Sequence, residues 1–235
     1  ELAQQAQGLA ERNVTHIGPG AGADEWLIGY GAKGLGLLQA PRQGRARLQA
    51  LNLRSAGDAP PLDAQRVLAT AWQAGVLWVG TQQGLYEVDW ASRQARRLAL
   101  PLPQPFPRIE ALQLDRSGAL WIGTVEGLLR EHQGRFERFQ HEPLRADSLV
   151  HSRVNALLLD RAGRLWVGTK GGLALHLGQG RFQNHRHEPA RADSLCHADA
   201  VSLREDGQGR IWIATLGGGL CRLDDAAPGQ PGRFR

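Results

Sequence analysis

Two short stretches bring together the residue types of a hydrolase. Asp147, Ser148 and His151 lie in the run DSLVH, and the run DSLCH from Asp193 to His197 repeats the arrangement. A catalytic triad is assembled by the fold from separate parts of a chain, so neighbours in sequence do not form one. Because the word occurs twice, we interpret it as a recurring loop whose aspartates accept hydrogen bonds from nearby backbone amides. No catalytic residues are predicted here.

Glycine-rich stretches raise the alternative of a phosphate site. The run GYGAKG from Gly29 to Gly34 has the spacing of a dinucleotide-binding loop, but that motif requires a helix after it. The run that follows, LGLLQAPRQG, is short and is interrupted by Pro41. The run RLWVGTKGGLAL from Arg164 recurs in similar form at three other places, and we interpret its glycines as hairpin residues with positive φ. No nucleotide or other cofactor is expected.

The composition excludes several classes of protein. The net charge is +5 at pH 7 and the basic residues are scattered, so no nucleic-acid partner is expected. No run of about 18 apolar residues is present, so no membrane span is predicted. Cys196 and Cys221 lack CxxC spacing, and a disulfide between them has no support in the sequence. His185 and His187 lack a third ligand, so we predict no metal site and place both on a solvated outer strand edge.

A repeated word organises the chain. The tryptophans that mark it recur at intervals of 43, 45 and 46 residues, and they are Trp78, Trp121, Trp166 and Trp212. An earlier, degenerate copy has Leu27 in the place of the tryptophan, 51 residues before Trp78. Five units of about 40–50 residues have the period of β-propeller blades.

The turns and strands of one unit indicate how the blades pack. The word Asp-x-x-Gly, at Asp115, Asp160 and Asp206, suits a type I turn whose aspartate accepts hydrogen bonds from the turn's own amides. The next run, such as LWVG, is apolar at every position, which is expected of a strand covered on both faces. We therefore expect three of the tryptophans to fill the space between blades, namely Trp121, Trp166 and Trp212.

Each unit holds four short strand candidates between turn signals, without a convincing helical period. In the fourth unit these candidates begin at Arg153, Arg164, Gly172 and Arg181. We predict an all-β fold, a β-propeller built of four-stranded antiparallel blades, as a single domain over residues 1–235. The five predicted blades lie at about residues 13–55, 64–100, 107–141, 152–187 and 198–235.

The repeated passage extends beyond the hairpin word. Residues 135–169 are repeated by residues 181–215 without a gap at an offset of 46, including the DSL loop. Together with the word Asp-x-x-Gly-x-Leu-Trp-Val/Ile-Gly-Thr-x-x-Gly-Leu, this passage resembles the two-component regulator propeller repeat. The resemblance covers residues 67–224 well and residues 13–55 more weakly. Members of that family are usually sensor parts of bacterial membrane receptors, followed by a β-sandwich, a membrane helix and a histidine kinase or diguanylate cyclase.

The resemblance implies a periplasmic, extracytoplasmic sensing module that is not itself an enzyme and meets the membrane only through segments downstream. Since the family often has seven blades, five units predict a fragment of a seven-bladed propeller, and a closed five-bladed ring is the alternative. An open array would leave the apolar faces of its end blades uncovered, which would favour a homodimer.

Candidate binding residues come from one rim of the propeller. With this strand order, the loop before the innermost strand and the second hairpin lie at the same rim. The polar residues there are Arg66, Arg108, Glu110, His151, Arg153, Asn155, His197 and Asp199 from the loops and strand starts, and Gln82, Glu126 and Lys170 from the hairpins. Such mixed groups suit a small polar ligand, such as an oligosaccharide or an acidic sugar. Solvated loop residues without a ligand are the alternative explanation.

Three functions remain open at this point. The first is a ligand-sensing module without catalysis, which we favour because no catalytic constellation is apparent. The second is a lyase-like propeller enzyme, in which His151 or His197 would act as the general base. The third is a protein–protein interaction platform, which predicts a broad exposed apolar patch on one rim.

Overall fold

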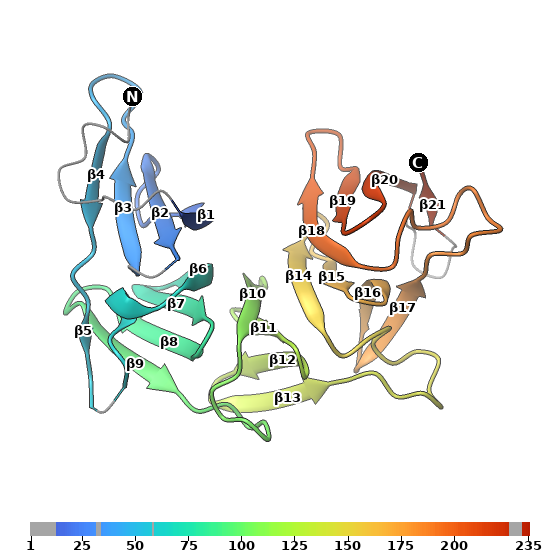
Figure 1. The fold of residues 1–235 in the computed structure, drawn as a ribbon, viewed down its shortest axis with the longest axis horizontal. Helices are drawn as coiled ribbons and strands as arrows, with labels where there is room; N and C mark the ends of the chain where they lie inside the picture. The colour runs from blue at the N-terminus through green and yellow to red at the C-terminus, as the bar shows by residue number, and fades with distance from the viewer. Residues whose placement is uncertain (1–12, 32–33, 58, 226–231) are drawn as a thin grey trace. The chain divides into compact units, whose positions relative to one another are not determined.

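The computed structural model describes residues 13–31, 34–57, 59–225 and 232–235 (Figure 1). Its strands form five sheets, each built on four antiparallel strands in which consecutive strands are neighbours, and the one helical segment among the described residues is the 3-10 turn Leu62–Ala64. The predicted all-β propeller of four-stranded blades is therefore confirmed. No helix in the described ranges is long and apolar enough to cross a membrane. The chain divides into two compact units, residues 1–109 and 110–235.

The first unit holds two blades. Blade 1 consists of β1 (Val14–Pro19), β2 (Glu25–Tyr30), β3 (Leu35–Gln39) and β4 (Arg47–Ala50). Blade 2 consists of β6 (Val67–Gln73), β7 (Val76–Thr81), β8 (Gly84–Asp89) and β9 (Gln94–Leu98). A short strand that was not predicted, β5 (Arg54–Ser55), pairs with β9 in parallel. Residues 32 and 33 of the GYGAKG run lie outside the described residues, and a strand, β3, follows that run where a nucleotide site needs a helix.

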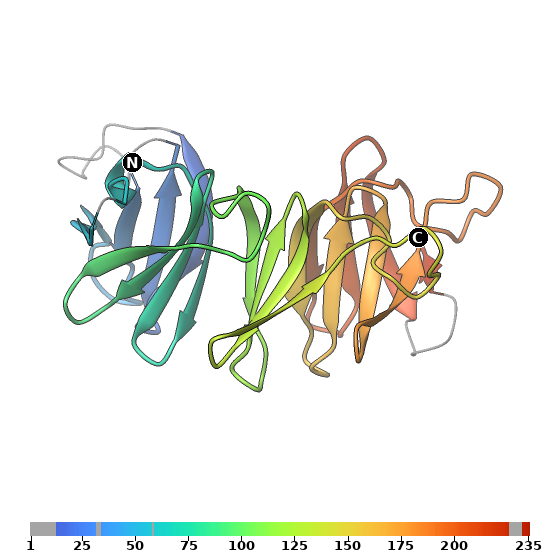
Figure 2. The same cartoon turned by 90° about the horizontal axis from the view of Figure 1, so that it is seen from below.

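The second unit holds three blades. Blade 3 consists of β10 (Ile109–Leu114), β11 (Leu120–Thr124), β12 (Gly127–His132) and β13 (Arg135–Phe139). Blade 4 consists of β14 (Val154–Leu159), β15 (Leu165–Thr169), β16 (Gly172–Gly178) and β17 (Arg181–His185). Blade 5 consists of β18 (Ala200–Glu205), β19 (Ile211–Thr215), β20 (Gly219–Asp225) and β21 (Arg233–Phe234). The inner strand β14 packs against β11 on one side and β18 on the other, and Figure 2 shows the three sheets side by side.

The second strands carry the core between these sheets. β11 and β15 are buried along their whole length, as expected of strands covered on both faces. Trp121 and Trp166 are only 2% and 0% exposed, which confirms their predicted place between blades. Trp212 is only partly buried, and the guanidinium groups of Arg210 and Arg222 lie 5.9 and 5.7 Å from its ring centre. Charged side chains thus cover a ring that was expected to pack against a sheet.

The first-hairpin turns hold the tryptophans by hydrogen bonds. In blade 4, Oδ1 of Asp160 accepts the backbone N–H of Arg164 at 2.8 Å, and Oδ2 accepts the indole N–H of Trp166 at 2.9 Å. Asp115 and Asp206 make the same two kinds of bond in their own blades. The bonds to turn amides confirm the prediction, whereas the bonds to the indoles were not predicted.

Blade 2 departs from this pattern. Its first hairpin is a two-residue turn at Ala74 and Gly75, whose φ values are 46° and 86°. Two residues with positive φ are typical of a tight type I′ hairpin, and no aspartate is present. The indole nitrogen of Trp78 is accordingly buried without a hydrogen-bond partner among the described residues. The aspartate–tryptophan bond is therefore a feature of blades 3 to 5.

The second hairpins explain the glycine-rich runs. Gly172 has a φ of 145°, and a Cβ there would lie 2.5 Å from the carbonyl oxygen of His185, so only glycine fits. The hydroxyl of Thr169 donates to the Gly172 carbonyl at 2.8 Å and accepts the N–H of Gly171 at 3.1 Å. The same threonine closure recurs in blades 2, 3 and 5. The glycines turn hairpins, as predicted.

Candidate functional site

The loop before the inner strand meets the second hairpin of the same blade. In blade 4, the backbone N–H of Lys170 donates to the carbonyl of Arg153 at 3.1 Å. In blade 2, the N–H of Gln82 donates to the carbonyl of Arg66 at 3.3 Å. Both loops therefore lie at one end of the blade, which is the end from which the candidate residues were chosen.

Four candidates form a polar row along the inner strands of the second unit, and these are Glu110, Arg153, Asn155 and Asp199. A guanidinium nitrogen of Arg153 lies 3.7 Å from the carboxylate of Glu110. The side-chain amide of Asn155 donates to the carboxylate of Asp199 at 2.8 Å. This polar row spans blades 3, 4 and 5 and contains two carboxylates, a guanidinium group and a side-chain amide.

A β-bulge positions the amide of the polar row. The pairing of β14 with β15 shifts between Val154 and Ala156, so Asn155 is left out of the ladder. Its freed side chain also donates to the carbonyl of Ala200 in blade 5, at 3.1 Å. Thr15 makes the corresponding bond from blade 1 to blade 2, at 2.6 Å. The bulge thus turns a polar side chain toward the neighbouring inner strand in both units.

His151 and His197 lie beside the polar row in equivalent positions. In each ring, Nδ1 accepts the backbone N–H two residues further on, that of Arg153 at 2.9 Å and that of Asp199 at 3.2 Å. This bond leaves the ring proton on Nε2. Burial, and then the charge of Lys170, lower the pKa of His151, so this ring is neutral at pH 7.

The remaining candidates belong to other loops and hairpins. Arg66 and Arg108 precede β6 and β10 and belong to the first unit. Glu126 lies in the second hairpin of blade 3, and its carboxylate is 3.6 Å from a guanidinium nitrogen of Arg138 on the outer strand β13. Lys170 is exposed on the corresponding hairpin of blade 4. The structure therefore brings together about half of the predicted set.

The two DSL loops share one internal hydrogen-bond pattern. The hydroxyl of Ser148 accepts the backbone N–H of Glu142 at 3.0 Å and donates to its carbonyl at 3.1 Å, and the second loop does the same. Asp147 does not bond to amides as predicted, because the serine satisfies the loop and the aspartate instead accepts the Nε–H of Arg145 at 2.9 Å. The Asp, Ser and His residues of this motif therefore belong to a hydrogen-bonded loop, and they do not form a catalytic triad.

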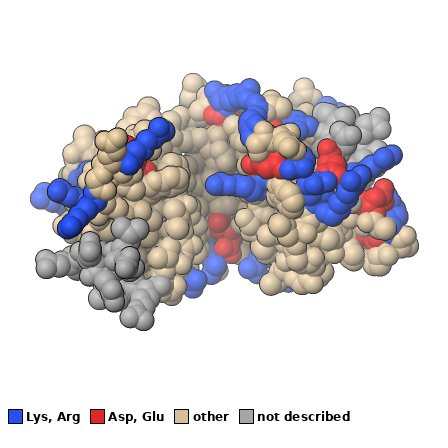
Figure 3. Space-filling model, turned by 90° about the horizontal axis from the view of Figure 1, so that it is seen from above, with Lys and Arg blue, Asp and Glu red and all other residues tan. Residues whose placement is uncertain are grey.

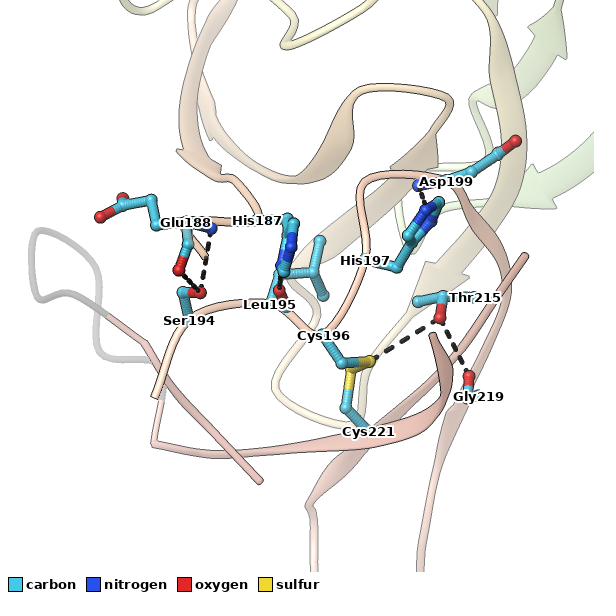
Figure 4. Close-up of a disulfide and its surroundings, with 10 residues drawn as sticks. All are labelled: His187, Glu188, Ser194, Leu195, Cys196, His197, Asp199, Thr215, Gly219 and Cys221. Carbon is cyan, nitrogen blue, oxygen red and sulfur yellow. Dashed lines mark hydrogen bonds between the residues drawn. A yellow bond between two sulfur atoms is a disulfide. The ribbon is translucent and has the colours of Figure 1, made fainter. Parts of the chain in front are cut away.

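A disulfide joins the second DSL loop to blade 5, contrary to the expectation from sequence. Cys196 in the loop is bonded to Cys221 in β20, with their Cα atoms 6.1 Å apart (Figure 4). In blade 4 the corresponding residues, Val150 and Ala174, pack in one buried cluster. The fold of the repeat brings these two positions together although they are 25 residues apart in blade 5. The bond also anchors the loop just before His197, as Figure 4 shows.

The placement of His185 on a solvated edge is wrong. The residue is 7% exposed, and its ring centre lies 6.1 Å from that of Trp166 and 5.6 Å from that of Phe234 in blade 5. The register of β17 turns this side chain toward the next blade, where an outward position was expected. His187 follows the end of β17 and is exposed, with Nδ1 at 2.7 Å from the Leu195 carbonyl. Within the described ranges, no three metal-binding side chains lie together.

We expect the free energy of unfolding to fall between pH 6.5 and 4 because of His185. Burial lowers the pKa of His185 from 6.5 to about 4, and Nε2 has no hydrogen-bond partner among the described residues. Between these pH values the unfolded chain binds the proton and the folded chain does not, so acid favours unfolding. This loss of unfolding free energy is absent above about pH 6.5 and reaches roughly 3 kcal/mol below pH 4.

The variant His185→Phe separates this effect from other titrating groups. It introduces the residue that blade 3 carries at the corresponding position, Phe139. Urea unfolding at pH 7 and pH 4 should show a smaller loss of stability in the variant than in the wild type. An equal loss in both would contradict the role of His185. His16, whose pKa is also lowered to about 4 by burial, contributes equally to the two proteins and cancels in the difference.

The chain is a β-propeller built of repeats. Each blade has four antiparallel strands joined by recurring turns, and tryptophans pack between blades. Residues 148–171 and 194–217 match the family model for the two component regulator propeller. These stretches begin in the DSL loop of blades 4 and 5 and end in the second hairpin. These two stretches therefore carry the two component regulator propeller repeat, which confirms the predicted resemblance for blades 4 and 5.

Solved structures share this fold at low sequence identity. One is described as the extracellular domain of a hybrid two component system of B. thetaiotaomicron, with a TM-score of 0.70 and 20% identity over 94% of this chain and 28% of that chain. A catalytically inactive virginiamycin B lyase from Staphylococcus aureus has a TM-score of 0.66 and 13% identity over 96% of this chain and 71% of that one. PorZ, a surface component of the type-IX secretion system of Porphyromonas gingivalis, has a TM-score of 0.61 and 18% identity over 89% of this chain and 32% of its own.

At these identities the likeness shows the fold alone. The chain spans 28% of the length of the two component system domain and 32% of PorZ. No curated protein matches the sequence.

Proposed function

We propose that this propeller is the extracytoplasmic ligand-sensing module of a bacterial signal-transduction receptor, and that the polar row binds a small polar ligand. The polar row is the main support for this proposal, because it places hydrogen-bond donors and acceptors of three blades side by side. An oligosaccharide suits it, since sugar hydroxyls both donate and accept. An acidic sugar suits it as well, because the half-exposed guanidinium of Arg153 can pair with a carboxylate.

Three observations support the extracytoplasmic location. The chain carries two component regulator propeller repeats, and one structure with the same fold is described as the extracellular domain of a two component system. The Cys196–Cys221 disulfide is of a kind that persists in oxidising compartments. A membrane anchor, a kinase or cyclase output domain and a homodimeric assembly are proposed for the whole receptor.

The surface charge favours a small ligand over a nucleic acid. Figure 3 shows Lys and Arg interspersed with Asp and Glu on one face. In the DSL loop of blade 4, Arg145 lies 3.3 Å from the carboxylate of Glu142 and 2.9 Å from that of Asp147. Cations that are paired with neighbouring carboxylates attract phosphates weakly.

Calorimetric titration of the chain with oligosaccharides and uronic acids tests the proposal. We expect Arg153→Ala to weaken the binding of a uronic acid by roughly tenfold or more, because a charge-assisted hydrogen bond is lost. The matched control is Arg135→Ala, which removes an exposed arginine from the outer strand β13 and should leave binding unchanged. Absence of heat with every sugar, or equal affinity in Arg153→Ala and the wild type, would contradict the proposal.

A lyase-like enzyme is the second candidate, because the fold is shared with virginiamycin B lyase and two histidines lie beside the polar row. A general base needs an available lone pair. In His151 the Nδ1 lone pair is occupied by the Arg153 amide, and Nε2 carries the proton, so the ring offers a donor. This geometry favours sensing. Turnover of a bound sugar that disappears in His151→Ala and His197→Ala would establish the enzyme instead.

A further inference from the structure

A hollow of about 580 Å³ lies between blades 3 and 4, at the end of the blades opposite the polar row. Gly163 and Gly180, from the first and third hairpins of blade 4, lie at its margin. Side chains of both blades form its walls, and those that matter here are Trp121, Arg130, Glu137, Phe139, Leu159 and His176. The volume is within the range of small-molecule sites, roughly 300–1,000 Å³.

The hollow differs in its side chains from the next interface, between blades 4 and 5. Arg130 pairs with Trp121 in its sheet, whereas the residue paired with Trp166 in blade 4 is Leu175. His176 likewise stands where blade 5 has Leu223. At the interface between blades 4 and 5, both leucines belong to one buried apolar cluster. Polar residues therefore occupy, between blades 3 and 4, the positions that leucines fill between blades 4 and 5.

The guanidinium of Arg130 is held loosely. Its nitrogens lie 3.8 Å from the carboxylate of Asp115 and 3.6 Å from that of Glu137, which is too long for hydrogen bonds. In the next blade, by contrast, the Nε–H of Arg164 donates to Asp160 at 2.7 Å. The N–H groups of Arg130 are thus available to a molecule in the hollow.

Aromatic rings form the apolar part of the wall. Phe139 is stacked against Trp121 with 5.7 Å between ring centres, and the ring of His176 lies 4.9 Å from that of Trp121 and 6.0 Å from that of Phe139. Trp121 is buried, whereas Phe139 and His176 remain partly exposed. These two rings can therefore receive the apolar face of a ligand.

The charges around the hollow select a neutral ligand. Burial and the charge of Arg130 lower the pKa of His176, so this ring is uncharged at pH 7. The carboxylates of Asp115 and Glu137 and the guanidinium of Arg130 lie in the wall, and the guanidinium of Arg145 donates to the carbonyl of Gly180 at 2.8 Å. Because charges of both signs surround the hollow, a ligand without net charge is favoured.

We propose that the hollow between blades 3 and 4 binds a neutral saccharide of one or two rings. Its C–H face packs on Phe139 and His176, and its hydroxyl groups bond to Arg130 and Glu137. This site goes beyond the proposed sensing function, because it shares no residue with the polar row and holds whether or not the row binds a ligand.

Calorimetric titration with glucose, galactose, maltose and cellobiose tests the site, with glucuronate and glucosamine as charged comparisons. The variant Arg130→Leu/His176→Leu introduces the two leucines of the next interface and should remove the polar groups of the hollow while keeping the fold. We expect the wild type to bind at least one neutral sugar in preference to both charged ones, and the double variant to bind it at least tenfold more weakly. Arg153→Ala, which changes only the polar row, should bind it as the wild type does.

Three outcomes would overturn the site. These are no binding of any neutral sugar by the folded wild type, equal affinity in the double variant, and loss of binding in Arg153→Ala alone, which would assign the sugar to the polar row. If the double variant does not fold, Glu137→Gln gives the same test. It introduces the residue of blade 4 at that position, Gln183, on a side chain that is 60% exposed, and it should weaken binding without unfolding the blade.

Discussion

Replacing Asp160 by alanine should lower the free energy of unfolding by roughly 3 kcal/mol, because buried donors lose their acceptor. Asp160 is 3% exposed and accepts the backbone N–H and the Nε–H of Arg164 at 2.8 and 2.7 Å. It also accepts the indole N–H of Trp166, a residue with no exposed surface, at 2.9 Å. Without the carboxylate, that indole N–H is left unpaired at the interface between blades, and Arg164 loses its ion pair with Asp160.

Chemical unfolding followed by tryptophan fluorescence measures this loss. The control is Asp147→Ala, which removes an exposed aspartate from a loop and should change stability by less than about 0.5 kcal/mol. A similarly small change for Asp160→Ala would contradict the role of the turn. Burial raises the pKa of Asp160, but the bonds from Trp166 and Arg164 outweigh it, so the pKa is held below 3.8. The stabilisation should therefore be complete above pH 3.8 and disappear only in stronger acid.

Removing the disulfide should lower the free energy of unfolding by about 3.5 kcal/mol, the loop-entropy value for a separation of 25 residues. The variant Cys196→Val/Cys221→Ala isolates the cross-link, since it introduces the residues that blade 4 has at these positions, Val150 and Ala174. Those two residues pack in a buried cluster, so the variant keeps the contact and loses the bond. The effect arises mainly in the unfolded chain, whose freedom the bond restricts.

Urea unfolding with and without dithiothreitol measures the contribution of the disulfide. The reduced wild type should be about as stable as the double variant, and the reductant should leave the variant unchanged. A wild type whose unfolding is insensitive to the reductant would show that the two cysteines are not bonded in solution.

The fold could be predicted because its determinants are local and repeated. The Asp-x-x-Gly turn at Asp160 satisfies its own amides, and Gly172 adopts a φ that other residues rarely adopt. The spacing of the tryptophans then gives the blade period. By contrast, β5 pairs with β9 through two residues only, and such a short pairing leaves no pattern in the sequence.

What the sequence did not predict depends on contacts between segments. The disulfide and the burial of His185 were missed because they were judged from Cys and His spacing along the chain. The positions equivalent to Cys196 and His185 in a neighbouring blade, Val150 and Phe139, are apolar, and this comparison within the repeat is the signal that could have revealed both. The four residues of the polar row were among the eleven predicted candidates, but the pairing of Asn155 with Asp199 depends on a bulge that sequence does not specify.

The central claim is that the inner-strand ends of blades 3 to 5 receive the ligand. The most direct test is the amide spectrum of isotope-labelled protein during titration with the best-binding acidic sugar or oligosaccharide. We predict saturable shifts at Arg153, Asn155 and Asp199, with none along the outer strand β13. Shifts confined to the outer strands, with the polar row unperturbed at saturation, would contradict the claim.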